Sequence, residues 1–267
     1  MSSAAMPVIL EPRSRSATPA IEIRGLSKRF GRVEVLRGID LDIAPGRVTA
    51  VVGPNGAGKT TLIKSIIGLV HATGGTIRVG GASVIDGDDY RARIGYMPQI
   101  ARFPHNLSGT ELLAMLKDLR RSAAPDSEVD EKLIALFHLG DELTKPLRAL
   151  SGGTRQKVNA VAAFLFHPEL LILDEPTAGL DPLSSSVLKD KIAEERRAGR
   201  TVVITSHVMS DLQELADDLI VLLDGWVRYA GTVSHLLDSM RQRTLERAIA
   251  RLMIGDDVQL GVASCIR

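Results

Sequence analysis

The sequence VTAVVGPNGAGKTTL, residues 48–62, decides the fold. Its first five residues predict a buried strand over 48–52. Residues 60–69 predict a helix, because Leu62, Ile63, Ile66 and Ile67 form one apolar face. The segment between them fits the pattern G-x-x-x-x-G-K-S/T. A strand, a glycine-rich turn and a helix in this order predict a loop that binds the phosphates of a nucleotide.

This phosphate-binding loop, residues 53–60, offers two kinds of contact. Its glycines let the backbone N–H groups point at phosphate oxygens, and the helix N-terminus adds the positive end of a dipole. Lys59 is expected to reach the β- and γ-phosphates of ATP, and the hydroxyl of Thr60 to bind Mg²⁺. The ATP contacts expected here are Gly53, Asn55, Gly56, Ala57, Gly58, Lys59, Thr60 and Thr61.

Two carboxylates follow another apolar stretch. Residues 170–173 predict a strand, and Asp174 and Glu175 come directly after it. Ligands of open α/β sheets bind at the carboxyl ends of the strands, so both side chains are expected near the phosphates. Asp174 suits the water shell of Mg²⁺, and Glu175 is expected to orient or deprotonate the attacking water.

A second glycine-containing loop precedes a helix expected to run to about residue 166. Ser151, Gly152 and Gly153 offer free N–H groups, a hydroxyl and a helix dipole, which together suit an anion. The simpler interpretation is that Ser151 only caps the helix. The alternative is that this loop serves a nucleotide bound to another copy of the chain, because the first loop already supplies a full set of phosphate contacts.

Short apolar runs alternate with helical patterns along the chain, which predicts a mainly parallel α/β sheet covered on both faces. Asp126, after Ala124 and Pro125, is the expected N-cap of a second helix within 110–139, and Pro182 is expected to start another helix. Leu245, Ile249 and Leu252 predict a closing amphipathic helix. The remaining predicted strands are 76–79, 94–97, 202–205 and 219–223.

Composition narrows the class of protein. The chain has 267 residues and a net charge of +1, which gives no argument for nucleic acid as a partner. Its one cysteine, Cys265, excludes an intramolecular disulfide and a multi-cysteine metal site. No run reaches the roughly 18 to 20 apolar residues that cross a bilayer. The first 20 residues lack an apolar core of a signal peptide, so we expect a mobile tail and a cytoplasmic protein.

With both loops in view, the sequence resembles the ABC ATPase family. LSGGTRQ, residues 150–156, is similar to the signature loop of that family, although Thr154 stands where glutamine is usual. The resemblance covers about residues 21–236. It implies that ATP is held between two copies, one giving the phosphate-binding loop and the other the signature loop. The residues expected to act on the partner's ATP are Ser151, Gly152, Gly153 and Thr154.

The resemblance also implies roles for single residues elsewhere. Phe30 is similar to the aromatic that stacks on adenine, and Asp181 lies in a segment, residues 179–181, that is similar to the D-loop. Gln99 is similar to the glutamine that senses Mg²⁺ and the γ-phosphate, so the implied metal residues are Thr60, Gln99 and Asp174. His207 is similar to the switch histidine that contacts the γ-phosphate, which makes Glu175 and His207 the expected catalytic pair.

For the fold, the resemblance implies a P-loop NTPase of ABC type. Its mainly parallel core carries an antiparallel N-terminal β-subdomain and an inserted α-helical subdomain at about residues 100–165. The expected organisation is a tail at 1–20, a nucleotide-binding domain at 21–236, and a C-terminal amphipathic helix and tail at 237–267.

Among ABC machines, the sequence favours a transporter ATPase that works with separate membrane permease subunits at the inner face of the membrane. Ribosome-associated relatives carry two cassettes in one chain, and the chromosome-maintenance class separates its motifs by a long coiled coil. This chain has one cassette and no heptad run. A soluble ATPase of iron–sulfur assembly stays open as an alternative, as does an exporter ATPase for another cargo.

Within the family, three stretches are similar to the NosF-type ATPases of copper-processing systems that mature nitrous-oxide reductase. The stretches are LSGGTRQKVNA, ILDEPTAGLDP and TLERAIARLM. This finer resemblance implies copper- or sulfur-related transport and a periplasmic accessory protein as a further partner. The chain has no cysteine or histidine cluster that could carry copper, so the metal would be handled by partners.

Overall fold

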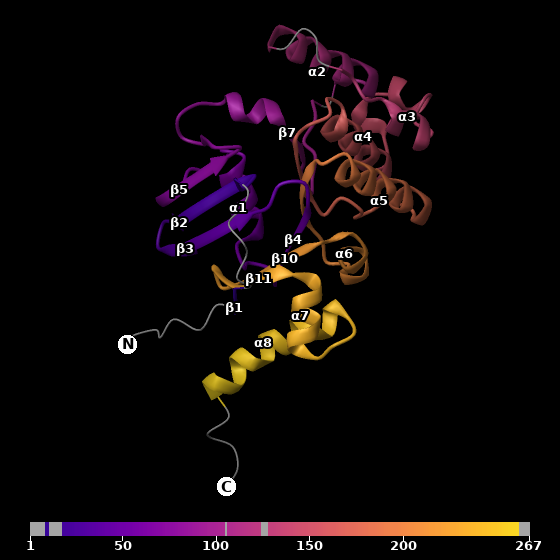
Figure 1. Ribbon diagram of the computed structural model, residues 1–267. Coiled ribbons are helices and arrows are strands. Elements are labelled where there is room, and N and C mark those ends of the chain that lie inside the picture. Colours follow the sequence, from indigo (N-terminus) through magenta and orange to yellow (C-terminus); the bar gives the residue numbers. More distant parts are fainter. Residues whose placement is uncertain (1–8, 11–17, 105, 124–127, 262–267) are drawn as a thin grey trace.

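The computed structural model describes residues 9–10, 18–104, 106–123 and 128–261. Its main sheet has seven strands in the order β1-β11-β10-β4-β9-β8-β7 (Figure 1). Neighbouring strands are parallel except for the pair β10 and β11. The strands are β1 (Ile9–Leu10), β4 (Val48–Val52), β7 (Ile94–Met97), β8 (Leu170–Asp174), β9 (Thr201–Thr205), β10 (Asp218–Leu223) and β11 (Trp226–Thr232).

Both faces of this sheet are buried, as the continuous apolar strands predict. Successive side chains of a strand point to opposite faces. In β8, Leu171 and Leu173 join the hydrophobic core on one face, while Leu170 and Ile172 join the core on the other. The strands β4, β9 and β10 alternate between the two cores in the same way. The prediction of a mainly parallel sheet covered on both sides is confirmed.

A second, antiparallel sheet of four strands has the order β3-β2-β5-β6. Helix α1 (Lys59–Ile66) lies between it and the main sheet, since Leu62, Ile63 and Ile66 share one core with Ile23 and Ile172 (Figure 1). The start of α1 therefore contacts β3. The strands are β2 (Ile21–Phe30), β3 (Val33–Ile43), β5 (Gly74–Val79) and β6 (Ala82–Ser83).

A group of helices is inserted between β7 and β8 and forms one end of the molecule (Figure 1). Its apolar side chains, among them Leu113, Phe137 and Phe164, continue the core of the main sheet. The predicted helical insertion therefore lies where the sequence placed it. Its elements are α2 (Gly109–Ala123), α3 (Lys132–Leu136), α4 (Gly152–Phe164) and the 3₁₀ turns η2 (Glu142–Thr144) and η3 (Leu147–Ala149). A further 3₁₀ turn, η1 (Asp89–Arg93), precedes β7.

The remaining helices cover the same face of the main sheet as α4. The closing helix was predicted from Leu245, Ile249 and Leu252, and all three are buried. The sequence patterns did not predict α6, α7 or β11. These helices are α5 (Pro182–Arg197), α6 (Met209–Leu215), α7 (Val233–Met240) and α8 (Leu245–Gly261).

Several local predictions need correction or fall outside the described residues. The helix predicted over 60–69 ends at Ile66, because Gly68 adopts a left-handed φ of 72° and turns the chain. Asp126 and Cys265 lie outside the described residues. Within the predicted N-terminal tail, Ile9–Leu10 pair with β11, while residues 1–8 and 11–17 are not described. The expected mobility of the tail stays a prediction.

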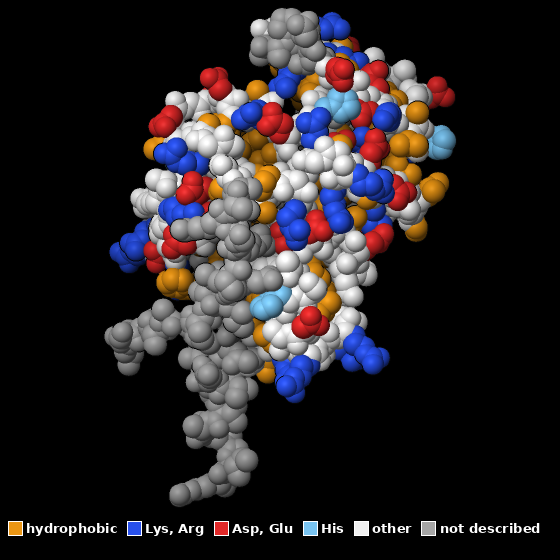
Figure 2. Space-filling model, viewed as in Figure 1, with side chains coloured by type: hydrophobic (Ala, Val, Ile, Leu, Met, Phe, Trp, Pro, Cys, Tyr) orange, Lys and Arg blue, Asp and Glu red, His pale blue; other side chains and the backbone are white. Residues whose placement is uncertain are grey.

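The described surface carries charges of both signs. Figure 2 shows Lys and Arg side chains interspersed with Asp and Glu side chains on the face drawn, and the whole chain has a net charge of +1. In the described part of the chain, no helix combines the length and apolar character that crossing a membrane requires.

Candidate functional site

The phosphate-binding loop lies between the end of β4 and the start of α1, as predicted. Gly53 has φ 151°, and a Cβ there would lie 2.1 Å from the carbonyl oxygen of Leu222. Gly58 has φ 107°, and a Cβ there would lie 2.8 Å from the side chain of Leu36. Both positions therefore favour glycine for conformation, and at Gly53 the backbone oxygen also leaves no room for a Cβ. Between them, Asn55 and Gly56 are exposed.

Lys59 forms hydrogen bonds within its own loop. Its Nζ donates hydrogen bonds to the carbonyl oxygens of Gly53 at 2.7 Å and Pro54 at 3.1 Å. Burial lowers the pKa of Lys59, while the carboxylates of Glu175 and Asp174 act against that shift. The ammonium group thus lies within the field of both carboxylates, and the two sequence motifs share one site. Thr60 is exposed and Thr61 half-buried on the first turn of α1.

The two carboxylates stand at the carboxyl end of β8, as the sequence predicted. Asp174 is buried, and its Oδ1 accepts a hydrogen bond of 2.6 Å from the hydroxyl of Thr205 on β9. The backbone N–H of Glu175 donates to both the carbonyl oxygen and Oγ1 of Thr205, each at 3.1 Å. Thr205 therefore fixes both residues, a role that the sequence analysis missed although it placed Thr205 at a strand end.

Glu175 and His207 lie together. The Oε2 of Glu175 accepts a hydrogen bond from the backbone N–H of His207 at 3.1 Å. The Nε2 of His207 lies 3.2 Å from Oε1, but that oxygen is buried without a hydrogen bond among the described residues. A buried carboxylate oxygen without an aligned donor is costly, and it can accept a hydrogen bond from a water or substrate. The imidazole of His207 is more than half exposed.

Gln99 and Phe30 lie at the ends of strands in different sheets. Gln99 follows β7, which pairs with β8 so that Met97 is opposite Leu173. It is exposed, two residues beyond that pair. Phe30 ends β2, and its ring is half exposed. The Nζ of Lys28 lies 4.7 Å from the centre of that ring, a cation–π contact.

The loop that resembles a signature begins α4. Ser151 is the N-cap of α4, and its Oγ accepts from the N–H of Thr154 at 3.1 Å. The two hydroxyl oxygens are 2.8 Å apart. Ser151 thus caps α4, while the exposed Gly152 beside it faces open space. A Cβ on Gly153 would lie 2.9 Å from the carbonyl oxygen of Gly179, so this loop contacts the segment predicted as the D-loop.

Asp181 belongs to that predicted D-loop segment and caps α5. Its carboxylate accepts from the N–H of Ser184 at 2.9 Å and from the Ser184 hydroxyl at 2.7 Å. Lys157 of α4 lies 3.1 Å away. These hydrogen bonds from Ser184, with the charge of Lys157, hold the pKa of Asp181 far below its usual value. Asp181 is therefore a carboxylate that links the start of α5 to α4.

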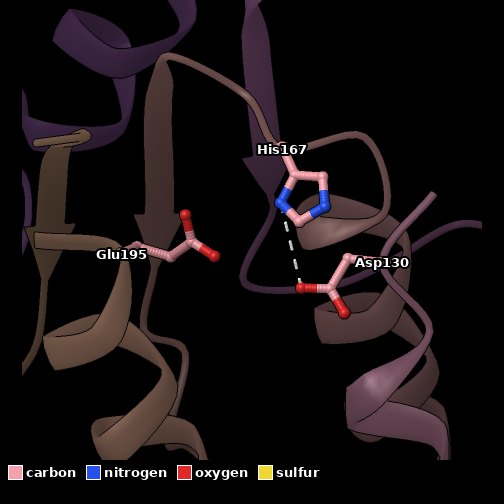
Figure 3. Close-up of side chains that lie close together, drawn as sticks. All are labelled: Asp130, His167 and Glu195. Carbon is pink, nitrogen blue, oxygen red and sulfur yellow. Dashed lines mark ion pairs between the residues drawn. The ribbon is translucent and has the colours of Figure 1, made fainter. Parts of the chain in front are cut away.

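One further cluster has the residue types of a metal site. Potential ligand atoms of Asp130, His167 and Glu195 lie within 4.8 Å of one another (Figure 3). However, the Nζ of Lys191 lies 2.7 Å from Asp130 and 2.8 Å from Glu195. Burial raises the pKa of Asp130, but hydrogen bonds from Lys191 and Lys132 outweigh it and the pKa is lowered. The ammonium group supplies the positive charge, so the donor set does not fit a metal.

With this geometry in place, comparison with known proteins identifies the family. The family profile described as ABC transporter matches residues 36–178, which is more than half of the chain. The chain belongs to the ABC transporter family. ATP-binding subunits of this family hydrolyse ATP, and this chain is such a subunit. The roles of the individual predicted site residues stay proposals.

Among curated ABC relatives, the daunorubicin/doxorubicin resistance ATP-binding protein DrrA of Streptomyces peucetius is 38% identical over 230 residues, covering 85% of this chain and 70% of that protein. The Nod factor export ATP-binding protein I of Ralstonia nicotianae is 30% identical and covers 78% and 66%. The zinc import ATP-binding protein ZnuC of Halorhodospira halophila is 35% identical and covers 86% and 84%.

A solved structure of an ATP-binding subunit of an ABC transporter has the same fold as this ABC ATPase. It is 29% identical, with a TM-score of 0.80, and the match covers 88% of this chain and 99% of that one. The predicted ABC-type fold, with its antiparallel sheet and helical insertion, is therefore confirmed.

Proposed function

We propose that two copies of this chain bind Mg²⁺-ATP between them, hydrolyse it at Glu175, and so drive a separate membrane permease. One observation carries the proposal. The buried carboxylate of Glu175 stands at the end of β8 with Oε1 free to accept a hydrogen bond, in the same electrostatic neighbourhood as Lys59. A carboxylate in this place can take the proton of an attacking water.

Binding begins at the phosphate-binding loop. The Nζ of Lys59 donates to two backbone carbonyl oxygens, and it can exchange these partners for the more strongly accepting oxygens of the β- and γ-phosphates. The backbone N–H groups at the start of α1 add the positive end of the helix dipole. The exposed ring of Phe30 offers a stacking surface for adenine, in keeping with the role predicted for it.

Thr60, Gln99 and Asp174 are the residues that would hold Mg²⁺. A hydroxyl, an amide oxygen and a carboxylate are hard oxygen donors, which is the chemistry that Mg²⁺ prefers. When bound, the ion would neutralise negative charge on the phosphate oxygens. The hydroxyl of Thr205 occupies Oδ1 of Asp174 and thereby fixes the orientation of this carboxylate.

Hydrolysis then depends on Glu175 and His207. The backbone N–H of His207 holds Oε2 of Glu175, which leaves Oε1 to orient the water and accept its proton. The exposed imidazole of His207 is available to the γ-phosphate. Closure of the two copies around ATP would complete the site, and release of phosphate would let them separate.

The second copy supplies the signature loop. Ser151 is exposed at the N-terminus of α4, beside the open space at Gly152. Free N–H groups at a helix N-terminus favour phosphate oxygens. We assign Ser151, Gly152, Gly153 and Thr154 to the ATP of the partner copy, and Asp181 to the adjoining D-loop. Thr154, which stands where glutamine is usual in the family, places a hydroxyl beside that of Ser151.

We further propose export as the direction of transport, with the chain at the inner face of the cell membrane. The relatives named for drug resistance and for Nod factor export favour this direction, and the zinc import relative makes import the alternative outcome. Iron–sulfur assembly is less favoured, since these relatives are named for resistance or transport. Copper processing with a periplasmic accessory protein stays a prediction from the resemblance alone.

The substitution Glu175→Gln tests the proposal. It keeps the size of the side chain and removes the proton acceptor, so ATP turnover should fall at least about 100-fold. Light scattering with Mg²⁺-ATP should then detect a dimer that retains ATP. Glu169→Gln is the control, because the side chain of Glu169 is exposed and pairs with Arg93 at the surface; this variant should keep the parental rate. Parental turnover in Glu175→Gln, with no ATP-bound dimer, would contradict the proposal.

A further inference from the structure

The turn that carries Glu175 has an unfavourable backbone. Glu175 has φ 53°, in the left-handed region that residues other than glycine seldom adopt. Such a conformation persists only where the surrounding structure holds it, and it is common at functional sites. The contacts around this turn therefore decide where its carboxylate points.

The main sheet holds the turn through the backbone N–H of Glu175. The N–H of Glu175 donates to the carbonyl oxygen and the hydroxyl of Thr205, both at 3.1 Å. The same hydroxyl donates to Asp174. Strand β9 thus fixes the turn from its N-terminal side.

Helix α4 holds the turn through two backbone carbonyl oxygens. The Nε2 of Gln156 donates to the carbonyl oxygens of Glu175 and Pro176, both at 3.3 Å. The N–H of Ala178 also donates to the Glu175 carbonyl, but it belongs to the turn itself. Gln156 is buried, so its donor has no water to bond in place of these oxygens.

Asn159 extends this contact to the segment before Gln99. It lies three residues after Gln156 and on the same face of α4. Its Nδ2 donates to the carbonyl oxygen of Pro98 at 2.8 Å and reaches Oε1 of Gln156 at 3.5 Å. Carbonyl oxygens only accept, so the orientation of both amides is fixed by their partners. Asn159 is 2% exposed.

We infer that Gln156 and Asn159 are positioning residues for ATP hydrolysis. Together they form an amide bridge from α4 to the Glu175 turn and to the residue preceding Gln99. The first turn of α4 carries Ser151, so a shift of this helix when the signature loop meets the partner's ATP moves both contacts at once. The inference rests on the proposed role of Glu175. In it, the side chains of Gln156 and Asn159 carry a movement of α4 to the Glu175 turn and to Pro98.

The test uses the full chain with Mg²⁺-ATP and the variants Gln156→Met and Asn159→Leu. Each keeps the approximate shape of the side chain and deletes the donor. We expect kcat to fall about tenfold in each, because the proton acceptor is displaced. The Kd for ATP should change by less than about twofold, since the phosphate-binding loop and Phe30 are untouched. The double variant should be no slower than the slower single variant, because the two amides act as one unit.

Val158→Ala is the matched control. Val158 lies between the two amides on α4 and is fully buried, so its truncation lowers stability without touching the bridge. Its kcat should stay within about twofold of the parent at a temperature where all variants are folded. If Gln156→Met does not fold, Gln156→Asn, whose amide is one methylene shorter, takes its place with the same expected loss.

Parental kcat in Gln156→Met and Asn159→Leu would overturn the inference, as would an equal loss of kcat in Val158→Ala. Glu175→Gln, measured in parallel, separates the two possible failures. If that variant loses turnover while both bridge variants keep it, the bridge is wrong and the role of Glu175 stands. If Glu175→Gln retains turnover, the proposed function itself fails.

Discussion

At the scale of the residue, Lys59 shows how the site is held before nucleotide binds. Its ammonium group bonds to two carbonyl oxygens of its own loop, and burial lowers its pKa. The nearby carboxylates of Asp174 and Glu175 keep the charged form favourable. A phosphate oxygen that replaces a carbonyl forms a charge-assisted bond in the same place, so the loop keeps its shape when ATP binds.

Lys59→Ala is therefore predicted to weaken ATP binding. A hydrogen bond to a charged group contributes about 1.5–3 kcal/mol, which corresponds to at least about a tenfold rise in Kd. Titration calorimetry with ATP measures this directly. Lys64→Ala serves as the control, because Lys64 lies on the last turn of the same helix; its Kd should stay within about twofold. Unchanged affinity in Lys59→Ala would remove the phosphate-binding role of the loop.

The sequence predicted the side chains of this site better than their contacts. Lys59, Asp174 and Glu175 follow from local patterns, and the structure brings them together. Thr205 and Gln156 were missed, because their partners lie 30 and 19 residues away. Such contacts depend on the pairing of β8 with β9 and on the packing of α4, and no local pattern contains that information.

At the scale of the element, α5 is tied to the helical insertion by buried charge. Lys191 of α5 bonds to Asp130, which precedes α3, and to Glu195 one turn further along α5. Burial lowers the pKa of Lys191, but the two carboxylates outweigh this effect and the pKa is raised. The ammonium group therefore stays charged and joins the insertion to the helix that follows the D-loop.

Lys191→Met is predicted to destabilise the fold by about 3–5 kcal/mol, because it removes the nearest counter-charge of two buried carboxylates. Urea unfolding followed by circular dichroism gives the free energy of unfolding. Lys132→Met is the control, since Lys132 pairs with Glu194 at the exposed surface and should cost at most about 1 kcal/mol. Equal losses in the two variants would show that the buried cluster adds nothing beyond a surface pair.

The elements themselves were predicted where apolar patterns are strong. The strands β4, β8, β9 and β10 lie within one residue of their predicted bounds. The helix α1 is shorter than predicted, because Gly68 interrupts an apolar pattern that continues beyond it. Strand β11 was not predicted, although its side chains alternate between buried and partly exposed.

At the scale of the whole molecule, the chain holds two halves of an ATP site at different places. The phosphate-binding loop lies at the N-terminus of α1, beside the antiparallel sheet. Ser151 lies at the N-terminus of α4, in the helical insertion (Figure 1). The central claim is that a second copy brings these halves together. A two-fold symmetric pair would contain two such composite sites, each with one loop from either copy.

Mixing two inactive variants tests this claim most directly. Lys59→Ala removes the lysine that contacts the phosphates, and Ser151→Arg blocks the signature loop, so each variant alone should have little ATP turnover at ATP concentrations well below the raised Kd. In an equal mixture about half of the dimers are mixed, and each mixed dimer holds one intact site. Turnover should therefore recover to about a quarter of the parental rate. A mixture that stays as inactive as its components would contradict the composite site.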